Sequence, residues 1–218
     1  MKAEFKRKGG GKVKLVVGMT GATGAIFGVR LLQWLKAAGV ETHLVVSSWA
    51  NVTIKHETGY TLQEVEQLAT YTYSHKDQAA AISSGSFDTD GMIVAPCSMK
   101  SLASIRTGMA DNLLTRAADV MLKERKKLVL LTRETPLNQI HLENMLALTK
   151  MGTIILPPMP AFYNQPSSLE EMVDHIVFRT LDQFGIRLPE AKRWNGIEKQ
   201  KEELDHGLSR FQRISRSP

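Results

Sequence analysis

The sequence predicts an α/β fold in which one parallel sheet lies between two layers of helices. From residue 14 to residue 184, short apolar runs rich in β-branched residues alternate with segments of helical spacing. This alternation is typical of parallel sheets that carry helices on both faces. The strand segments are almost continuously apolar, as strands buried on both faces are. The chain shows no repeat and no low-complexity linker, so we expect a single domain.

Each element follows from a local pattern. Helix 112–125 is strongly amphipathic, and Asp111 is expected to be its N-cap. The proline-rich segment 157–168 is expected to be a functional loop or an arm that reaches another subunit. Strands are expected at 14–18, 41–46, 91–95, 128–131 and 153–156, and helices at 25–38, 50–56, 62–68, 112–125, 138–150 and 169–184.

The composition excludes several classes of protein. The hydrophobic fraction is 43% and the charged fraction 23%, as in ordinary globular domains. The single cysteine, Cys97, excludes an internal disulfide and suits a reducing compartment. No apolar run reaches the ~20 residues needed to span a bilayer, and residues 1–12 lack the apolar core of a secretory signal. We therefore expect a cytoplasmic protein that does not enter the membrane.

The formal net charge is +6, and much of it lies near the two ends of the chain. We expect a disordered basic extension at 1–12, a domain at 13–195 and a basic tail at 196–218. The chain has no zinc-finger spacing and no aromatic RNA-binding motif, so nucleic-acid binding is not expected. The six histidines have no metal-ligand spacing, and no metal is expected.

Polar or glycine-rich turns follow all five expected strands. In open parallel sheets ligands bind beyond the carboxyl ends of the strands, so these turns should meet at one edge. The turns lie at 20–24, 47–48, 96–101, 132–135 and 157–163.

The first turn joins a strand to a helix through closely spaced glycines. Glycines allow backbone N–H groups to approach a phosphate, and the helix N-terminus adds partial positive charge. The alternative is a tight turn that only packs closely. The hydroxyls of Thr20 and Thr23 favour the binding interpretation. A nicotinamide reductase is disfavoured, because Ser47 and Ser48 stand where an acidic ribose-binding residue is expected and no Tyr-x-x-x-Lys pair exists.

The later turns add further candidates. Cys97 is interpreted as a small buried residue rather than a nucleophile, and the segment from Ser98 to Ser101 offers amide donors. Arg133 is suited to bidentate phosphate binding, and Glu134 beside it to accepting or relaying a proton. The helix 112–125 also carries basic residues, which are either part of a site or an exposed face.

Five motifs together resemble the UbiX flavin prenyltransferases: GMTGATGA at 18–25, APCSMK at 95–100, DNLLTRAADV at 111–120, RETPL at 133–137 and PPMPAFY at 157–163. The resemblance implies a Rossmann-like (flavodoxin-like) three-layer fold. It implies a metal-independent enzyme that transfers a dimethylallyl group from dimethylallyl phosphate to reduced FMN. The prenylated FMN would serve a UbiD-type decarboxylase of aromatic or hydroxyarylic acids. The family forms homo-oligomers, often dodecamers, with sites at subunit contacts.

The resemblance also assigns residues. Many family members have serine where this chain has Thr23; threonine is associated with hydroxyarylic acid decarboxylase systems. FMN is assigned to Gly21, Ala22, Thr23, Ser47, Ser98, Met99, Lys100, Ser101 and Arg133. Dimethylallyl phosphate is assigned to Arg116, Lys123, Glu134, Tyr163, Arg179 and Trp194. The catalytic roles fall to Glu134, Thr23, Glu57 and Lys123.

Two alternatives remain open at this point. One is direct FMN-dependent decarboxylation of phenolic acids; related cysteine decarboxylases use a Pro-x-Met-Asn motif, whose asparagine is missing from Pro158-Met159-Pro160. The other is a non-catalytic FMN carrier, which would not need basic residues and Glu134 around a second phosphate.

Overall fold

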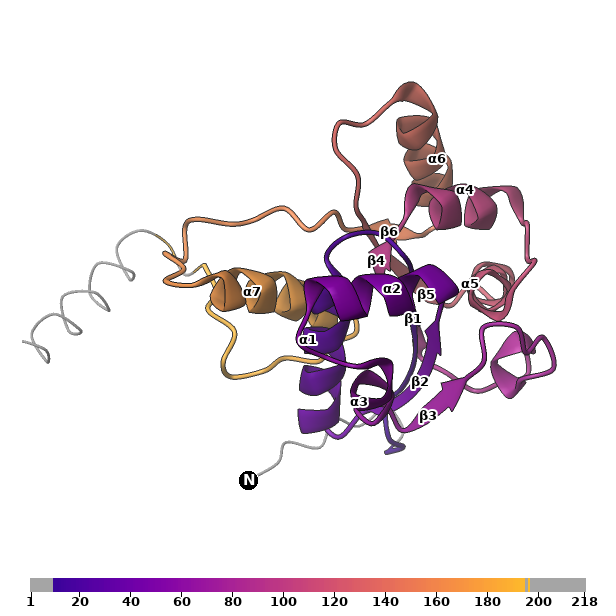
Figure 1. The fold of residues 1–218 in the computed structure, drawn as a ribbon, viewed down its shortest axis with the longest axis horizontal. Coiled ribbons are helices and arrows are strands. Elements are labelled where there is room, and N and C mark those ends of the chain that lie inside the picture. Colours follow the sequence, from indigo (N-terminus) through magenta and orange to yellow (C-terminus); the bar gives the residue numbers. More distant parts are fainter. Residues whose placement is uncertain (1–9, 195, 197–218) are drawn as a thin grey trace, which may run out of the picture.

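A computed structural model describes residues 10–194 and 196, and it confirms the α/β alternation (Figure 1). One sheet of six strands, all paired in parallel, has the order β3-β2-β1-β4-β5-β6. The strands are β1 (Lys14–Met19), β2 (Glu41–Val46), β3 (Tyr71–Tyr73), β4 (Gly91–Cys97), β5 (Lys127–Thr132) and β6 (Ile154–Ile155). The helices are α1 (Ala25–Ala37), α2 (Ser48–Glu57), α3 (Leu62–Glu66), α4 (Met99–Thr107), α5 (Leu113–Lys123), α6 (Gln139–Lys150) and α7 (Leu169–Asp182), with a 3₁₀ turn at Ala81–Ser83.

The strand order fixes where a ligand is expected. Without the short edge strand β3, the order is the one that flavodoxin-like sheets have; with β3 it becomes the 3-2-1-4-5-6 order of dinucleotide-binding sheets. In both orders the direction of winding reverses between β1 and β4. The crevice beyond the carboxyl ends of these two strands is therefore the expected site.

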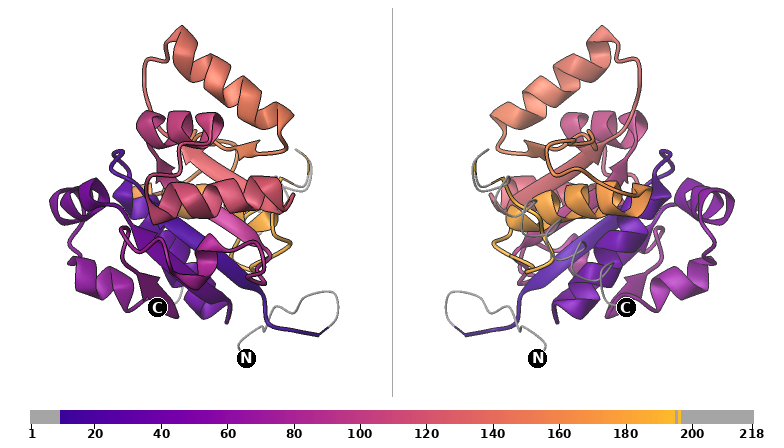
Figure 2. Two further views of the ribbon diagram at one scale, coloured as in Figure 1. Left: turned by 90° about the vertical axis from the view of Figure 1, so that its right-hand side faces the viewer. Right: turned by 90° about the vertical axis from the view of Figure 1, so that its left-hand side faces the viewer.

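Two hydrophobic clusters, one on each face of the sheet, make up the core. Helices α1 and α7 pack on one face and on each other, while α4 and α5 cover the other face (Figures 1 and 2). Asp174 joins α7 to α1, because its carboxylate accepts hydrogen bonds from Arg30 Nε (2.8 Å) and from Trp34 Nε1 (2.9 Å). Helix α7 is thereby held on the α1 face, away from α5.

Three features differ from the expectations. Strand β3 was not predicted from the sequence, and no bounds were predicted for helix α4. The N-cap of α5 is Asn112 rather than Asp111, because Asn112 Oδ1 accepts the Thr115 N–H at 3.1 Å.

The proposed terminal extension and tail lie almost wholly outside the described residues and stay predictions. In the described ranges, no helix has the length and apolar character needed to cross a bilayer.

Candidate functional site

Thr20 ties the first turn to the turn after β4, at the point where winding reverses. Its hydroxyl donates to the carbonyl of Pro96 (2.8 Å) and accepts the N–H of Ser98 (2.8 Å). Thr20 is only 2% exposed. The expectation that this hydroxyl donates to a ligand is therefore wrong, since its proton is already used inside the protein. Thr20 instead holds the two turns together.

Glu57 closes the N-terminus of helix α1. Its carboxylate accepts the N–H groups of Gly24 (2.7 Å) and Ala25 (3.0 Å), although it lies more than thirty residues further along the chain. Partial burial alone would raise the pKa of Glu57, but the N–H of Ala25, the Thr23 hydroxyl, the N–H of Gly24 and the charge of Arg133 together lower it. Glu57 is thus an anion held among donors, and the structure brings it together with Thr23 and Arg133.

The glycine turn keeps part of its donor capacity. The N–H groups of Gly24 and Ala25 are taken by Glu57, so these two do not serve a phosphate here. Among the described residues, no hydrogen bond uses the N–H groups of Gly21, Ala22 and Thr23. Gly21 also has to be glycine, because a Cβ at this position would lie 2.4 Å from the Cβ of Trp49.

The neighbouring turns meet the first one. Ser47 caps α2 through its hydroxyl, and its N–H donates to the carbonyl of Met19 (3.0 Å). Ser98 caps α4, and its hydroxyl donates to Ser101 (3.1 Å). The Arg133 N–H donates to the carbonyl of Cys97 (3.0 Å). The turns after β1, β2, β4 and β5 therefore form one edge. We call the residues Gly21–Thr23, Ser47, Glu57, Ser98–Ser101, Arg133 and Glu134 the edge site.

Two residues at this edge, Cys97 and Glu134, differ in burial. Cys97 is fully buried, and burial raises the pKa of its thiol to about 12, so it is a packing residue and not a nucleophile. Glu134 is exposed and directly follows Arg133, with its carboxylate accepting the N–H of Thr135 at 3.0 Å. The Glu134 carboxylate is thus open to a ligand from solvent.

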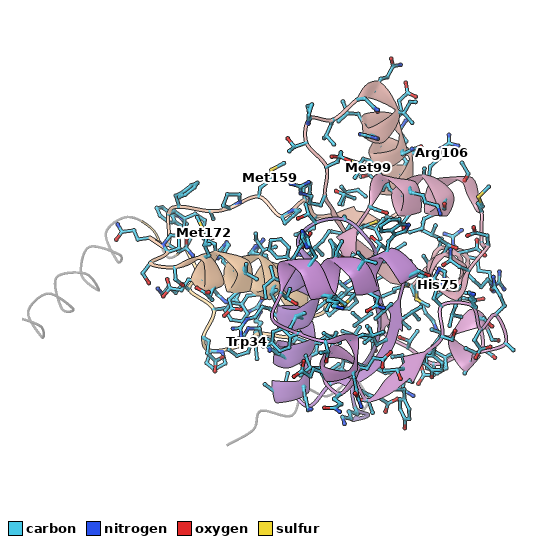
Figure 3. All side chains as sticks on the ribbon, in the orientation of Figure 1. Trp34, His75, Met99, Arg106, Met159 and Met172 are labelled. Atoms are coloured by element: carbon cyan, nitrogen blue, oxygen red, sulfur yellow. The ribbon has the colours of Figure 1, made fainter. Side chains whose placement is uncertain are left out.

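A second group of predicted residues lies apart from this edge. Tyr163, Arg179 and Trp194 line a cavity of about 330 Å³. The cavity lies between helix α7, the proline-rich arm that precedes this helix, and the segment 191–194 that follows it. The ring centroids of Tyr163 and Trp194 are 5.5 Å apart at 81°. In Figure 3, Met99 at the start of α4 and Met172 on α7 lie in different parts of the molecule. We call this the arm cavity.

The last two predicted residues, Arg116 and Lys123, form a third group on α5. Arg116 pairs with Asp119 (2.8 Å) and donates to the carbonyl of Ser83 (3.1 Å). Lys123 pairs with Glu124 where α5 ends, just before the amino end of β5. Within one chain the structure does not bring Arg116 and Lys123 to the edge site or to the arm cavity.

Sequence reasoning missed several residues of the arm cavity. Asp182, Arg193 and His175 also line it. Two features of the sequence could have indicated these residues: Asp182 follows Arg179 by three positions on one helix, and Arg193 is next to Trp194. Among the described residues, no group of three or more His, Cys, Asp or Glu side chains could hold a metal ion.

Comparisons with known proteins agree with this fold. A family model described as Flavoprotein matches residues 5–180. A protein of Bacillus subtilis (strain 168) named probable UbiX-like flavin prenyltransferase is 98% identical over 92% of this chain and 98% of its own length. The crystal structure of a dodecameric FMN-dependent UbiX-like decarboxylase from Escherichia coli O157:H7 is 61% identical over 84% of this chain and all of that chain, with a TM-score of 0.83.

A structure of AnUbiX (PadA1) in complex with FMN and dimethylallyl pyrophosphate is 54% identical over 85% of this chain and 98% of that chain, with a TM-score of 0.84. The fold, the converging turns and these similarities agree. The chain therefore belongs to the UbiX-like flavin prenyltransferases, within the wider Flavoprotein family.

Proposed function

We propose that this chain transfers a dimethylallyl group from dimethylallyl phosphate to reduced FMN, and that the product serves a UbiD-type decarboxylase. One observation carries the proposal: the edge site collects donors for a flavin, while a separate aromatic and basic cavity suits a small allyl phosphate. The relatives support it, since one at 98% identity is named a probable UbiX-like flavin prenyltransferase and one at 54% was solved in complex with FMN and dimethylallyl pyrophosphate.

The edge site fits FMN on the chemistry of its donors. The N–H groups of Gly21, Ala22 and Thr23 have no partner among the described residues and lie in the turn just before α1, whose own first N–H groups are taken by Glu57. Free N–H groups and an arginine can both donate to anionic oxygens, so this turn and Arg133 suit the anionic part of FMN. Ser47, Ser98, Met99, Lys100 and Ser101 complete the proposed FMN contacts.

The allyl phosphate is proposed to bind between copies of the chain. Tyr163, Arg179 and Trp194 line the arm cavity, whereas Glu134, Arg116 and Lys123 lie elsewhere on the same chain. Helix α6 projects from the body with Ile140, Leu142 and Leu146 all more than half exposed (Figure 1). Exposed apolar side chains on one helix are typical of subunit contacts. We propose a homo-oligomer, a dodecamer like the Escherichia coli relative, in which Arg116 and Lys123 complete the site of another copy.

The reaction requires neutralisation of the phosphate as its bond to the allyl carbon breaks. When bound, reduced FMN supplies the electron-rich nucleophile. Lys123, Arg116 and Arg179 are proposed to neutralise the phosphate, and Glu134 to exchange a proton with the departing phosphate. Tyr163 and Trp194 are proposed to exclude water, which would otherwise capture the allyl group. Thr23, held by the Glu57 carboxylate, is proposed to face the reacting edge of the flavin.

The proposal is tested with purified protein, FMN, a reductant and dimethylallyl phosphate under anaerobic conditions. We expect a flavin that is heavier by one five-carbon unit on mass spectrometry. Glu134→Gln should slow this conversion and leave FMN binding intact. An unchanged flavin mass with the wild-type protein would overturn the proposal.

A direct decarboxylase is the second candidate, because the 61% identical Escherichia coli structure carries that name. We expect no release of CO2 from phenolic acids by this chain alone, measured with FMN and without a UbiD-type partner.

We place the enzyme in the cytoplasm, because its only cysteine, Cys97, is buried and unpaired, as is usual in reducing compartments.

A further inference from the structure

Asp182 lies at the C-terminal end of α7 and holds two arginines at the arm cavity. Its carboxylate accepts a bidentate pair of hydrogen bonds from Arg193, with Nη1–Oδ2 and Nη2–Oδ1 both 2.7 Å. It also accepts a bond from Arg179 Nη1 at 3.1 Å. The Asp182 side chain is only 12% exposed, whereas Arg179 is 56% exposed. The bond to Arg193 is therefore the better formed of the two.

Arg193 immediately precedes Trp194, which forms one wall of the cavity. Trp194 is 50% exposed, so burial alone fixes its position only weakly. Its ring meets Tyr163, which in turn meets His175 edge-on at 5.6 Å. Because a bidentate arginine–carboxylate pair fixes both distance and orientation, it restrains the backbone next to Trp194.

We propose that Asp182 and Arg193 are positioning residues, and that their ion pair clasps the segment 191–194 to α7 so that Trp194 covers the allyl phosphate. This inference rests on the proposed function for the identity of the ligand. It assigns Arg193 to holding the wall of the cavity, not to neutralising phosphate.

The charge state of the clasp suits this role. The hydrogen bonds from Arg193 lower the pKa of Asp182, with help from the charges of Arg193, Arg179 and Arg187, and they outweigh the burial that would raise it. Asp182 therefore stays ionised at neutral pH, and the pair remains intact over the range in which phosphate is a dianion. His175, which faces the same cavity, has a pKa lowered by burial and by Arg179 and is neutral there.

Two substitutions with opposite effects on charge separate positioning from simple electrostatics. Asp182→Asn makes the cavity more positive by one charge, and Arg193→Gln makes it less positive by one. If Arg193 acted only through its charge, Asp182→Asn would lower the KM for dimethylallyl phosphate and Arg193→Gln would raise it. The clasp predicts that both raise KM about tenfold, by analogy with the lower end of the losses seen when a residue that orients a metal ligand is removed. It also predicts an unchanged Kd for FMN.

Further variants guard the test against misfolding. Arg193→Lys keeps the charge but cannot form the bidentate pair, so it should raise KM as well. Glu171→Gln is the matched control, because Glu171 on the same helix pairs with Lys192 in the same segment, but with side chains 39% and 60% exposed. It should leave KM unchanged. Melting temperatures and FMN binding report whether each variant folds.

A readout independent of turnover separates this inference from the proposed function. Acrylamide quenching of Trp194, measured in a Trp34→Phe, Trp49→Phe background, should increase with Asp182→Asn and with Arg193→Lys but not with Glu171→Gln. If the wild type prenylates flavin but quenching and KM do not change in these variants, the clasp is wrong. If the wild type does not prenylate flavin, the proposed function fails and quenching alone decides about the clasp. Opposite shifts of KM in Asp182→Asn and Arg193→Gln would also overturn it.

Discussion

Replacing Glu57 by glutamine tests how the edge site is assembled. The carboxylate accepts two N–H groups at the start of α1, from Gly24 at 2.7 Å and Ala25 at 3.0 Å, and it lies near Arg133. Glutamine keeps one acceptor oxygen but loses the charge and turns an NH2 group toward other donors. Glu57 is largely exposed, so solvent screening reduces the loss to about 1 kcal/mol. For a domain of this size, that lowers the melting temperature by about 3 °C.

The effect should depend on pH in a defined direction. The pKa of Glu57 is lowered in the folded protein, so its stabilisation is complete above the unfolded-state pKa of about 4.3 and fades as pH falls through the folded value. Thermal melts of wild type and Glu57→Gln at pH 7 and at about pH 3.5 measure this. The difference should be present at pH 7 and shrink at the lower pH.

The matched control is Glu190→Gln, which changes an exposed carboxylate outside the edge site and should melt with the wild type at both pH values. Equal melting temperatures for wild type and Glu57→Gln at pH 7 would refute the reasoning. A difference that stays the same at low pH would refute the electrostatic part of it.

Three further predictions concern the same region. Thr20→Val leaves the N–H of Ser98 without its partner and removes one of the two hydrogen bonds that the Pro96 carbonyl accepts from residue 20, so unfolding in urea should show a loss of about 1–3 kcal/mol, whereas Thr20→Ser should stay close to wild type. Because burial raises the Cys97 pKa to about 12, iodoacetamide should not alkylate native protein at pH 8 but should do so in urea; rapid native labelling would contradict this. Gly21→Ala should weaken FMN binding measured by fluorescence titration, because its Cβ would displace the first turn of α2 at Trp49; an unchanged Kd would show that this contact relaxes freely.

The sequence predicted the sheet well because its signals are local. Apolar runs and the turns that follow them gave five of the strands and the edge at which they end. Strand β3 (Tyr71–Tyr73) has only three residues, of which two are exposed and Tyr73 is half-buried, so it carries no apolar run to detect. The N-cap of α5 was placed one residue early because Asp111 and Asn112 are equally good caps and only the backbone decides between them.

The site was harder to predict from sequence because it depends on contacts that are distant along the chain. No local pattern indicates that Glu57 caps α1 or that Thr20 bonds to Pro96. The family resemblance named Arg116 and Lys123, but their separation from Glu134 follows from the direction of α5, which ends near the amino end of β5. The role of Asp182 needed the position of Arg193, eleven residues further along the chain.

The most direct test of a site shared between copies is complementation between two inactive variants. Glu134→Gln and Lys123→Ala are each expected to lose flavin prenylation. In mixed oligomers formed by coexpression in equal amounts, about a quarter of the sites would combine an intact Glu134 from one copy with an intact Lys123 from another. We predict prenylated flavin from the mixture at about that fraction of wild-type activity. No recovery in verified mixed oligomers would contradict the shared site.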